Sequence, residues 1–390
     1  MRNGKHCDLL IGTALLAGAT VLLHWPKECI SAVQEGISMC GNVLIPSLFP
    51  FLVLSNLVIS LGLSRYLGVW LEPLMRPLFR VGGSCSCALI LGLIGGYPIG
   101  ARTAISLYQN GQCSKSECER LLAFCNNSGP AFIFGVVGAG IFGNGTISLL
   151  LYLTHIIASL LVGLLFRFYG HDCPASHIKQ NSVQLHRQPF AAAFTRSITE
   201  SFTSVLNICS FVLFFTVFLR GLSLSGLLPA LSRLMTGLCA PIGLTHPCLE
   251  QLLTGFIELS SGVLSISGTG SLSGRASMAA FMLGWAGLSV HCQVLSFLGD
   301  CDLSARTYLL GKLLHGILSA VLTNLTIHCL SIEQTVSLFI GQSSELMSSF
   351  HFMHSLSLSA FCAAGCCGLF FLAAVLVWKK RGGKAGRCAL

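Results

Sequence analysis

One short stretch, residues 123–130, decides the fold, and it reads Ala123-Phe124-Cys125-Asn126-Asn127-Ser128-Gly129-Pro130. Just before it, Ser114-Lys115-Ser116-Glu117 has the spacing of a capping box and predicts a helix that runs to Leu122 and beyond. Gly129 and Pro130 must end this helix near the asparagine pair, and Pro130 suits the start of another helix. The sequence therefore predicts a broken helix, with free carbonyl groups before the interruption and free amide groups after it.

The composition places this broken helix in a membrane. Charged residues make up 9% of the chain and hydrophobic residues 53%, whereas a soluble domain has about 25% charged residues. Apolar runs near the length of about 20 residues that a bilayer requires recur along the chain. The expected spans cover residues 9–25, 43–63, 146–168, 201–219, 276–298, 308–330 and 358–378. We conclude that the chain is an all-α, polytopic membrane protein whose partner is the lipid bilayer.

The basic residues indicate the orientation of the chain. Arg2 and Lys5 precede the first apolar run, and five Lys or Arg residues follow the last one, from Lys379 to Arg387. By the positive-inside rule both termini are expected in the cytoplasm. The formal net charge of +9 therefore needs no nucleic acid to explain it.

Two apolar segments are too short and too rich in glycine to be simple spans. They are residues 88–101, which end in Gly95-Gly96-Tyr97-Pro98-Ile99-Gly100, and residues 130–145. An irregular backbone at membrane depth is tolerated where it is buried in protein or lines a wet cavity. These segments are therefore expected to form re-entrant hairpins or half-helices.

The pattern of residues 53–143 returns weakly in residues 212–300. The second apolar arm is interrupted at Glu258-Leu259-Ser260-Ser261-Gly262, and the second broken helix is expected at residues 284–289. The basic flanks of the first copy and their scarcity in the second favour inverted copies. The fold class is thus two inverted repeats with re-entrant hairpins and broken helices.

These patterns divide the chain into five parts. We expect an N-terminal anchor and amphipathic linker in residues 1–42, a first repeat in 43–168 and a polar cytoplasmic loop in 169–196. A second repeat then covers 197–330, and an extracytoplasmic stretch, a last span and a basic tail cover 331–390.

Paired interruptions in two halves of a chain are typical of the binding site of a transporter. The free amides after the first break favour an anionic ligand, although an ordinary interfacial loop would have the same sequence. We expect the two breaks to face each other, each beside its own hairpin tip. The residues expected to bind the cargo are Tyr97, Asn126, Asn127, Ser128, Ser260, Ser261 and Ser289.

Glu258 is the acidic residue that lies well inside an apolar stretch. A carboxylate at the centre of a bilayer costs roughly 2.5–3.5 kcal/mol, so such a residue usually has a function. Glu258 is expected to bind a coupling cation or a proton. The alternative is that it lies at the membrane interface or pairs with an arginine.

The sequence contains no motif for metal binding, nucleotide binding or nucleophilic catalysis. The 19 cysteines lie mostly in apolar runs without paired zinc spacing, and no phosphate-binding loop or nucleophile elbow occurs. Gly138-x-Gly140-x-x-Gly143 has no strand before it and is better explained by helix packing. We therefore expect no metal, no cofactor and no enzymatic activity, and both a monomer and an oligomer are compatible with the sequence.

Three motifs of the first half carry a family resemblance. They read Gly95-Gly96-Tyr97-Pro98-Ile99-Gly100-Ala101, Ser116-Glu117-Cys118-Glu119-Arg120-Leu121-Leu122 and the stretch 123–130 quoted above. Together they resemble the YlbJ-type sporulation integral membrane proteins of the nucleoside-recognition, or Gate, domain group. The likeness extends over about residues 43–330. The second half departs from it, because Gly287 and Leu288 stand where an asparagine pair would be.

The resemblance implies a function as well as a fold. Gate domains are similar to the core of concentrative nucleoside transporters, and the sporulation group implies a membrane of the mother cell or the outer forespore. The implied cargo is dipicolinate, a small aromatic dicarboxylate moved into the developing spore, although another carboxylate or a nucleoside would also suit the site. A membrane scaffold in spore-envelope assembly, which binds a ligand or partner without transport, is the remaining alternative.

Overall fold

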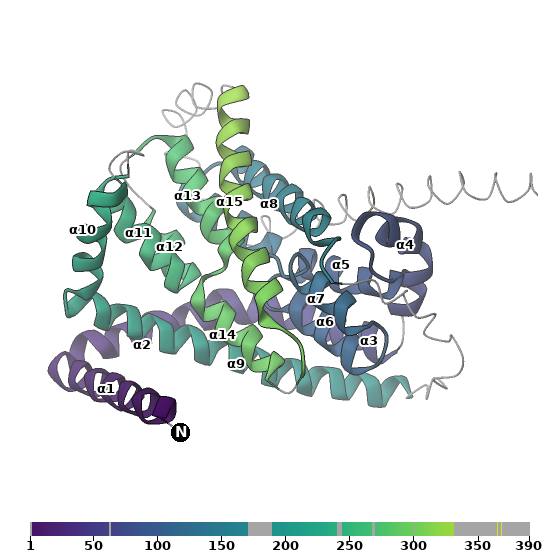
Figure 1. Cartoon of the computed structure of the whole chain (residues 1–390), viewed down its shortest axis with the longest axis horizontal. Helices are drawn as coiled ribbons and strands as arrows, with labels where there is room; N and C mark the ends of the chain where they lie inside the picture. Colours follow the sequence, from purple (N-terminus) through teal and green to yellow (C-terminus); the bar gives the residue numbers. More distant parts are fainter. Residues whose placement is uncertain are drawn as a thin grey trace, which may run out of the picture.

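The computed structural model describes residues 2–61, 64–170, 189–239, 244–266, 270–299 and 301–330, together with positions 365 and 368. Within these ranges the regular elements are all helical (Figure 1). Four helical segments are long and apolar enough to cross a membrane: α8 (Gly145–Phe166), α9 (Phe190–Leu224), α13 with α14 (Leu272–Leu298) and α15 (Ala305–Cys329). A fifth candidate, Val69–Phe79 with Gly83–Gly95, bends by 95°. The described residues thus confirm the predicted all-α membrane fold.

The N-terminal region is also helical. It contains α1 (Arg2–His24), α2 (Pro26–Met39), the π-helical turn η1 (Cys40–Leu44), α3 (Ile45–Ser60), α4 (Ser64–Phe79) and the short 3₁₀ turn η2 (Gly83–Cys85). The expected spans 9–25 and 43–63 lie largely within α1 and within η1 with α3. The expected span 358–378 lies outside the described residues.

The first re-entrant hairpin consists of α5 (Ser86–Gly95) and α6 (Ile99–Gln109). Both arms are too short to cross a bilayer. They pack closely, because a Cβ atom built on Gly92 would lie 3.0 Å from the Cα atom of Gly100. The predicted interruption at Gly95-Gly96-Tyr97-Pro98 forms the tip of this hairpin.

The first broken helix follows directly. Helix α7 (Lys115–Leu122) begins with the predicted capping box, in which the Ser114 hydroxyl accepts from the amide of Glu117. After the interruption the chain continues as η3 (Ala131–Phe142), a helix with π-type hydrogen bonds that begins directly after Pro130. The break therefore lies within residues 123–130, as the sequence predicts.

The second half repeats this order of elements. After α10 (Leu227–Cys239), a hairpin forms from α11 (His246–Ile257) and α12 (Leu259–Ser265), with Glu258 at its tip. A broken helix follows, with α13 (Leu272–Trp285) separated from α14 (Gly287–Leu298) at Ala286. Ala286 has a φ of 80°, a left-handed conformation that no regular helix contains. Each half thus supplies one hairpin and one broken helix.

Long helices surround these interrupted elements. Helix α15 packs against α8 and α13, and α9 runs along one side of the molecule past α2, α3 and α14 (Figure 1). Helix α9 has 35 residues and begins at Phe190, inside the loop that was expected at 169–196. The sequence gives no clear signal for this start, because alanine and hydroxyl residues rather than large apolar residues precede the apolar run. Residues 171–188 of that loop lie outside the described residues.

The loop between α14 and α15 is tied to the first half. The Tyr108 hydroxyl donates to Asp302 over 2.6 Å, and the Lys115 ammonium lies 2.9 Å from the same carboxylate. These two contacts, that of Tyr108 first, hold the pKa of Asp302 below its ordinary value. The two halves are therefore linked by polar contacts as well as by helix packing.

Candidate functional site

Both hairpin tips and both helix breaks line one cavity of about 70 Å³, which we call the tip cavity. The first tip supplies Gly96 and Tyr97, and the first break supplies Ser128 with Gly129. The second half supplies the residues Glu258, Leu259, Ser260, Ser289, Val290 and Gln293. The two breaks thus meet at one place, each beside its own hairpin tip, as the sequence predicts.

The first hairpin tip fits closely against the first break. Gly96 has a φ of 84°, and a Cβ atom built on it would lie 2.8 Å from the backbone nitrogen of Gly129. Only glycine satisfies both this left-handed conformation and this close approach. The backbone of the tip therefore lies directly on the interruption at residues 126–130.

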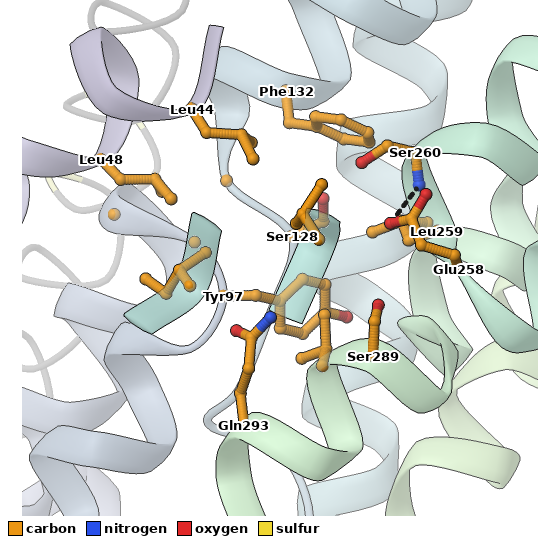
Figure 2. A pocket seen from close by; sticks show the side chains of 16 residues that line it. Leu44, Leu48, Tyr97, Ser128, Phe132, Glu258, Leu259, Ser260, Ser289 and Gln293 are labelled. Atoms are coloured by element: carbon orange, nitrogen blue, oxygen red, sulfur yellow. Dashed lines mark hydrogen bonds between the residues drawn. The ribbon is translucent and has the colours of Figure 1, made fainter. Parts of the chain in front are cut away.

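Tyr97 connects the first tip to the second half. Its hydroxyl donates to the carbonyl oxygen of Leu283 on α13 over 2.6 Å and accepts from the Lys312 ammonium on α15 over 2.7 Å. In Figure 2 its ring lies between Ser128 and Gln293. Tyr97 thus forms part of the cavity wall and fixes the position of the tip.

Glu258 lies in the opposite wall and caps its own hairpin arm. One carboxylate oxygen accepts from the amide of Ser260 over 3.0 Å (Figure 2). The other accepts from the amide of Ser261 over 2.7 Å. The side chain is 2% exposed, and no arginine or lysine forms an ion pair with it among the described residues. The alternative of pairing with an arginine is therefore not seen among the described residues, and the carboxylate occupies amides that an anionic ligand would otherwise use.

Lys312 is a second buried charged residue beside the cavity. Its Nζ atom donates to the Tyr97 hydroxyl, to the carbonyl oxygen of Asn126 over 2.9 Å and to His315 Nδ1 over 3.1 Å. The ammonium also lies 4.7 Å from the centre of the Tyr97 ring. An ammonium next to the free carbonyls at the end of a helix is favourable. Lys312 therefore joins the first tip, the first break and α15.

Polar residues behind the break extend this network. The amide of Ser128 donates to His155 Nε2 over 3.0 Å, so one of the predicted free amides is already satisfied. His315 Nε2 lies 2.9 Å from the carbonyl oxygen of His155, and His291 Nδ1 lies 3.0 Å from the Tyr308 hydroxyl. These contacts make the region behind the tip cavity a connected polar core.

Five of the eight predicted site residues line the tip cavity: Tyr97, Ser128, Glu258, Ser260 and Ser289. The other three lie behind its wall. The side chain of Asn126 contacts the amide of Ala101 and the hydroxyl of Tyr308, and that of Asn127 donates to the carbonyl oxygen of Phe124. Ser261 contributes the amide that caps Glu258. These three residues shape the site from outside the cavity.

Sequence reasoning missed Lys312 and Gln293. Lys312 lies inside the expected span 308–330, where a cation is as costly as the carboxylate of Glu258. That cost is the signal in the sequence that marks Lys312 as a candidate site residue. Gln293 lies one helical turn after Ser289 on α14, so the helical period places both residues on one face.

Comparisons with known proteins agree with this architecture. The family model for Gate, described as nucleoside recognition, matches residues 43–171 and 205–300. The chain is 35% identical over 339 residues to the sporulation integral membrane protein YlbJ of Bacillus subtilis (strain 168), a match that covers 82% of this chain and 83% of that protein.

Two solved structures of CNTnw are similar to this chain. The inward-facing, substrate-bound state has 14% identity and a TM-score of 0.45 over 83% of this chain and 85% of that chain. The N149L variant in its intermediate 1 state has 11% identity and a TM-score of 0.39 over 83% and 86%. On the family match and the similarity in sequence, the chain belongs to the Gate, or nucleoside recognition, family and within it to the sporulation integral membrane proteins of the YlbJ type.

Proposed function

We propose that the chain is a secondary transporter of a small organic anion, which it binds in the tip cavity. The observation that carries this proposal is the meeting of two hairpin tips and two helix breaks around one cavity. Irregular backbone in a membrane is costly unless it serves a cavity, and paired interrupted segments are how many transporters build their binding site. A fold that needed only to anchor a scaffold would have no use for these four interruptions.

The lysine beside the cavity supports an anionic cargo. Lys312 lies directly behind Tyr97, and once an anion is bound nearby its Nζ atom can hold a proton, whose charge acts over several ångströms in surroundings of low dielectric constant. With the sporulation relative, this charge favours dipicolinate, moved from the mother cell through the outer forespore membrane into the developing spore. The proposal also includes the orientation expected from the basic flanks, with both termini in the cytoplasm and the two repeats inverted. In this proposal the cargo crosses unchanged, without an enzymatic step.

A nucleoside is the second candidate, and Glu258 favours it. The carboxylate of Glu258 places negative charge in the cavity wall and occupies both amides at the start of α12. A neutral cargo with hydroxyl groups would donate to that carboxylate, whereas a dicarboxylate would be repelled by it unless a proton or cation is bound there. Glu258 is accordingly the proposed coupling site for an anionic cargo.

Uptake into proteoliposomes tests these two candidates. The purified chain is reconstituted, and the entry of labelled dipicolinate and labelled uridine is measured over a range of pH and sodium concentrations. Saturable uptake of dipicolinate, with little uptake of uridine, is the expected result. Uridine uptake alone would favour the nucleoside transporter. Failure of both, with a monodisperse and correctly inserted protein, would favour the scaffold.

Glu258→Gln tests the coupling role. Glutamine keeps the size of the side chain, and its amide oxygen still accepts from one backbone amide, so folding is expected to survive at a cost of about 1–3 kcal/mol for the other hydrogen bond. Because glutamine cannot ionise, the dependence of dipicolinate uptake on pH or sodium is expected to disappear.

Glu250→Gln is the matched control, because Glu250 lies on α11 of the same hairpin but does not line the cavity. This variant should keep the dependence of the parent chain. An unaltered dependence in Glu258→Gln would remove Glu258 from the coupling mechanism.

A further inference from the structure

A second, larger cavity lies next to the tip cavity. It measures about 730 Å³, within the range typical of small-molecule sites, and we call it the polar cavity. The same three helices line both cavities. These helices are α3, α9 and α14. They supply Leu48, Ile208 and Gln293 to the tip cavity. They supply Leu52, Asn207 and Ser296 to the polar cavity. The polar cavity therefore lies beside the tip cavity along neighbouring positions of the same helices.

Helix α9 presents a polar stripe to this cavity. The stripe repeats at helical spacing and consists of Arg196, Thr199, Glu200, Thr203, Ser204 and Asn207. Since α9 is one of the helices long and apolar enough to cross a membrane, a polar stripe on it is costly where it meets lipid. Facing an aqueous cavity removes that cost, which indicates a water-filled space between α9 and the first hairpin.

Helix α6 presents the opposite wall, and Arg102 is its charged residue. Among the described residues, neither an ion pair nor a hydrogen bond holds the guanidinium of Arg102, and its Nη1 atom is buried without a partner. The other charged residues of the cavity are Arg196 and Glu200, which form an ion pair at 2.7 Å. The lining thus carries one positive charge in excess.

The chemistry of this cavity suits a carboxylate. A guanidinium presents its donors in a planar fork that matches the two oxygens of a carboxylate. The side chains of Asn56 and Asn207 line the same cavity, and their amide groups can donate further hydrogen bonds to a ligand. Burying the Nη1 atom of Arg102 without a hydrogen-bond partner costs free energy. A small movement of the side chain would let this atom donate to a ligand oxygen, which would remove that cost.

We propose that the polar cavity is a second binding site for the transported organic anion, in which Arg102 binds a carboxylate before the anion reaches the tip cavity. This inference rests on the proposed function as an anion transporter. In this proposal the polar cavity selects the cargo by its charge, and the tip cavity holds the cargo in the occluded state. Because the carboxylate of Glu258 repels an anion until a proton or cation is bound there, a separate positive site explains how an anion would be held before it enters the tip cavity.

Arg102→Gln tests the proposal by uptake and by binding. Uptake of dipicolinate into proteoliposomes is expected to show a KM raised about tenfold to hundredfold, since a charge-assisted hydrogen bond is lost, while kcat changes little. Arg102→Lys, which keeps the charge without the planar fork, should recover part of the loss. Calorimetric titration of the detergent-solubilised chain with dipicolinate should show the same order of affinities.

The matched control is Arg233→Gln on α10, where the side chain is exposed and, among the described residues, donates to the carbonyl oxygen of Pro229. Its KM should equal that of the parent chain. An equal KM in Arg102→Gln, with transport by the parent chain intact, would overturn the second site and leave the proposed function standing. Equal losses of dipicolinate and uridine uptake in Arg102→Gln would also overturn it, because selection by charge would be absent. A parent chain that neither binds nor transports dipicolinate would overturn the proposed function together with this site.

Discussion

A chain with Lys312→Met is expected to insert and fold but to transport dipicolinate about a hundredfold more slowly. The ammonium holds the tip at Tyr97, the break at Asn126 and helix α15 together through hydrogen bonds of 2.7–3.1 Å. A hydrogen bond to a charged group contributes about 1.5–3 kcal/mol. The loss of roughly 3 kcal/mol from the arrangement that binds cargo corresponds to about a hundredfold in rate.

The fold should tolerate this change better than the function does. Methionine is close in volume to the lysine side chain, but it leaves the carbonyl oxygen of Asn126 and the Nδ1 atom of His315 without their donor. The melting temperature of the purified variant, measured by intrinsic fluorescence, is therefore expected moderately below that of the parent chain, with the protein still folded. Uptake and melting are measured on the same preparation, so that a folding defect is seen directly.

Lys115→Met is the control for removing a lysine. Lys115 is half-exposed and forms an ion pair with Asp302 outside the tip cavity. An exposed pair of this kind contributes about 0–1 kcal/mol, so both uptake and melting should stay close to those of the parent chain. Normal uptake by Lys312→Met would show that the charge behind Tyr97 takes no part in transport.

Local sequence signals predicted the interruptions of the fold. Gly95-Gly96-Tyr97-Pro98 predicted the first tip, the run through Gly129-Pro130 predicted the first break, and Glu258 within an apolar run marked the second tip. Each signal acts within a few residues: a proline or a glycine interrupts the helix where it stands, and a charge at membrane depth needs polar groups beside it. Such features can be predicted without knowledge of tertiary structure.

The direction in which the site residues point could not be predicted in the same way. Asn126 and Asn127 were expected in the cavity, but in an irregular segment neither the helical nor the strand period says where a side chain points. The partners of Tyr97 are also hidden, because Leu283 and Lys312 are 186 and 215 residues away in the chain. Only packing of the two halves brings these groups together.

The polar stripe of α9 was available in the sequence but was divided by an early boundary. Arg196 was assigned to the end of a loop and Asn207 to an apolar span, so their common helical face was not considered. Once the helix is known to begin at Phe190, the period of 3.6 residues places both on one side. The error in the boundary therefore concealed the polar cavity.

A Gly100→Ala chain is expected to lose most of its folded protein and all of its uptake. A Cβ atom built on Gly100 would lie 2.0 Å from the carbonyl oxygen of Cys125, and one built on Gly92 would meet the same oxygen at 2.0 Å. The obstacle on both sides is backbone, which no rotamer change can move. Overpacking a core with extra atoms costs typically 1–3 kcal/mol and more where the surroundings cannot adjust. The first hairpin would have to leave the break, and the tip cavity would lose one wall.

The control variant Gly237→Ala separates this clash from the general effect of a new methyl group. No atom lies within 4 Å of a Cβ atom built on Gly237, which is in α10, so this variant should be neutral or more stable by up to about 1 kcal/mol. Size-exclusion profiles of the detergent-solubilised variants, with their melting temperatures, give the comparison. A Gly100→Ala chain with the profile, melting temperature and uptake of the parent would show that the hairpin does not rest on Cys125. Because the tip cavity depends on that contact, the same result would remove the first hairpin from the binding site.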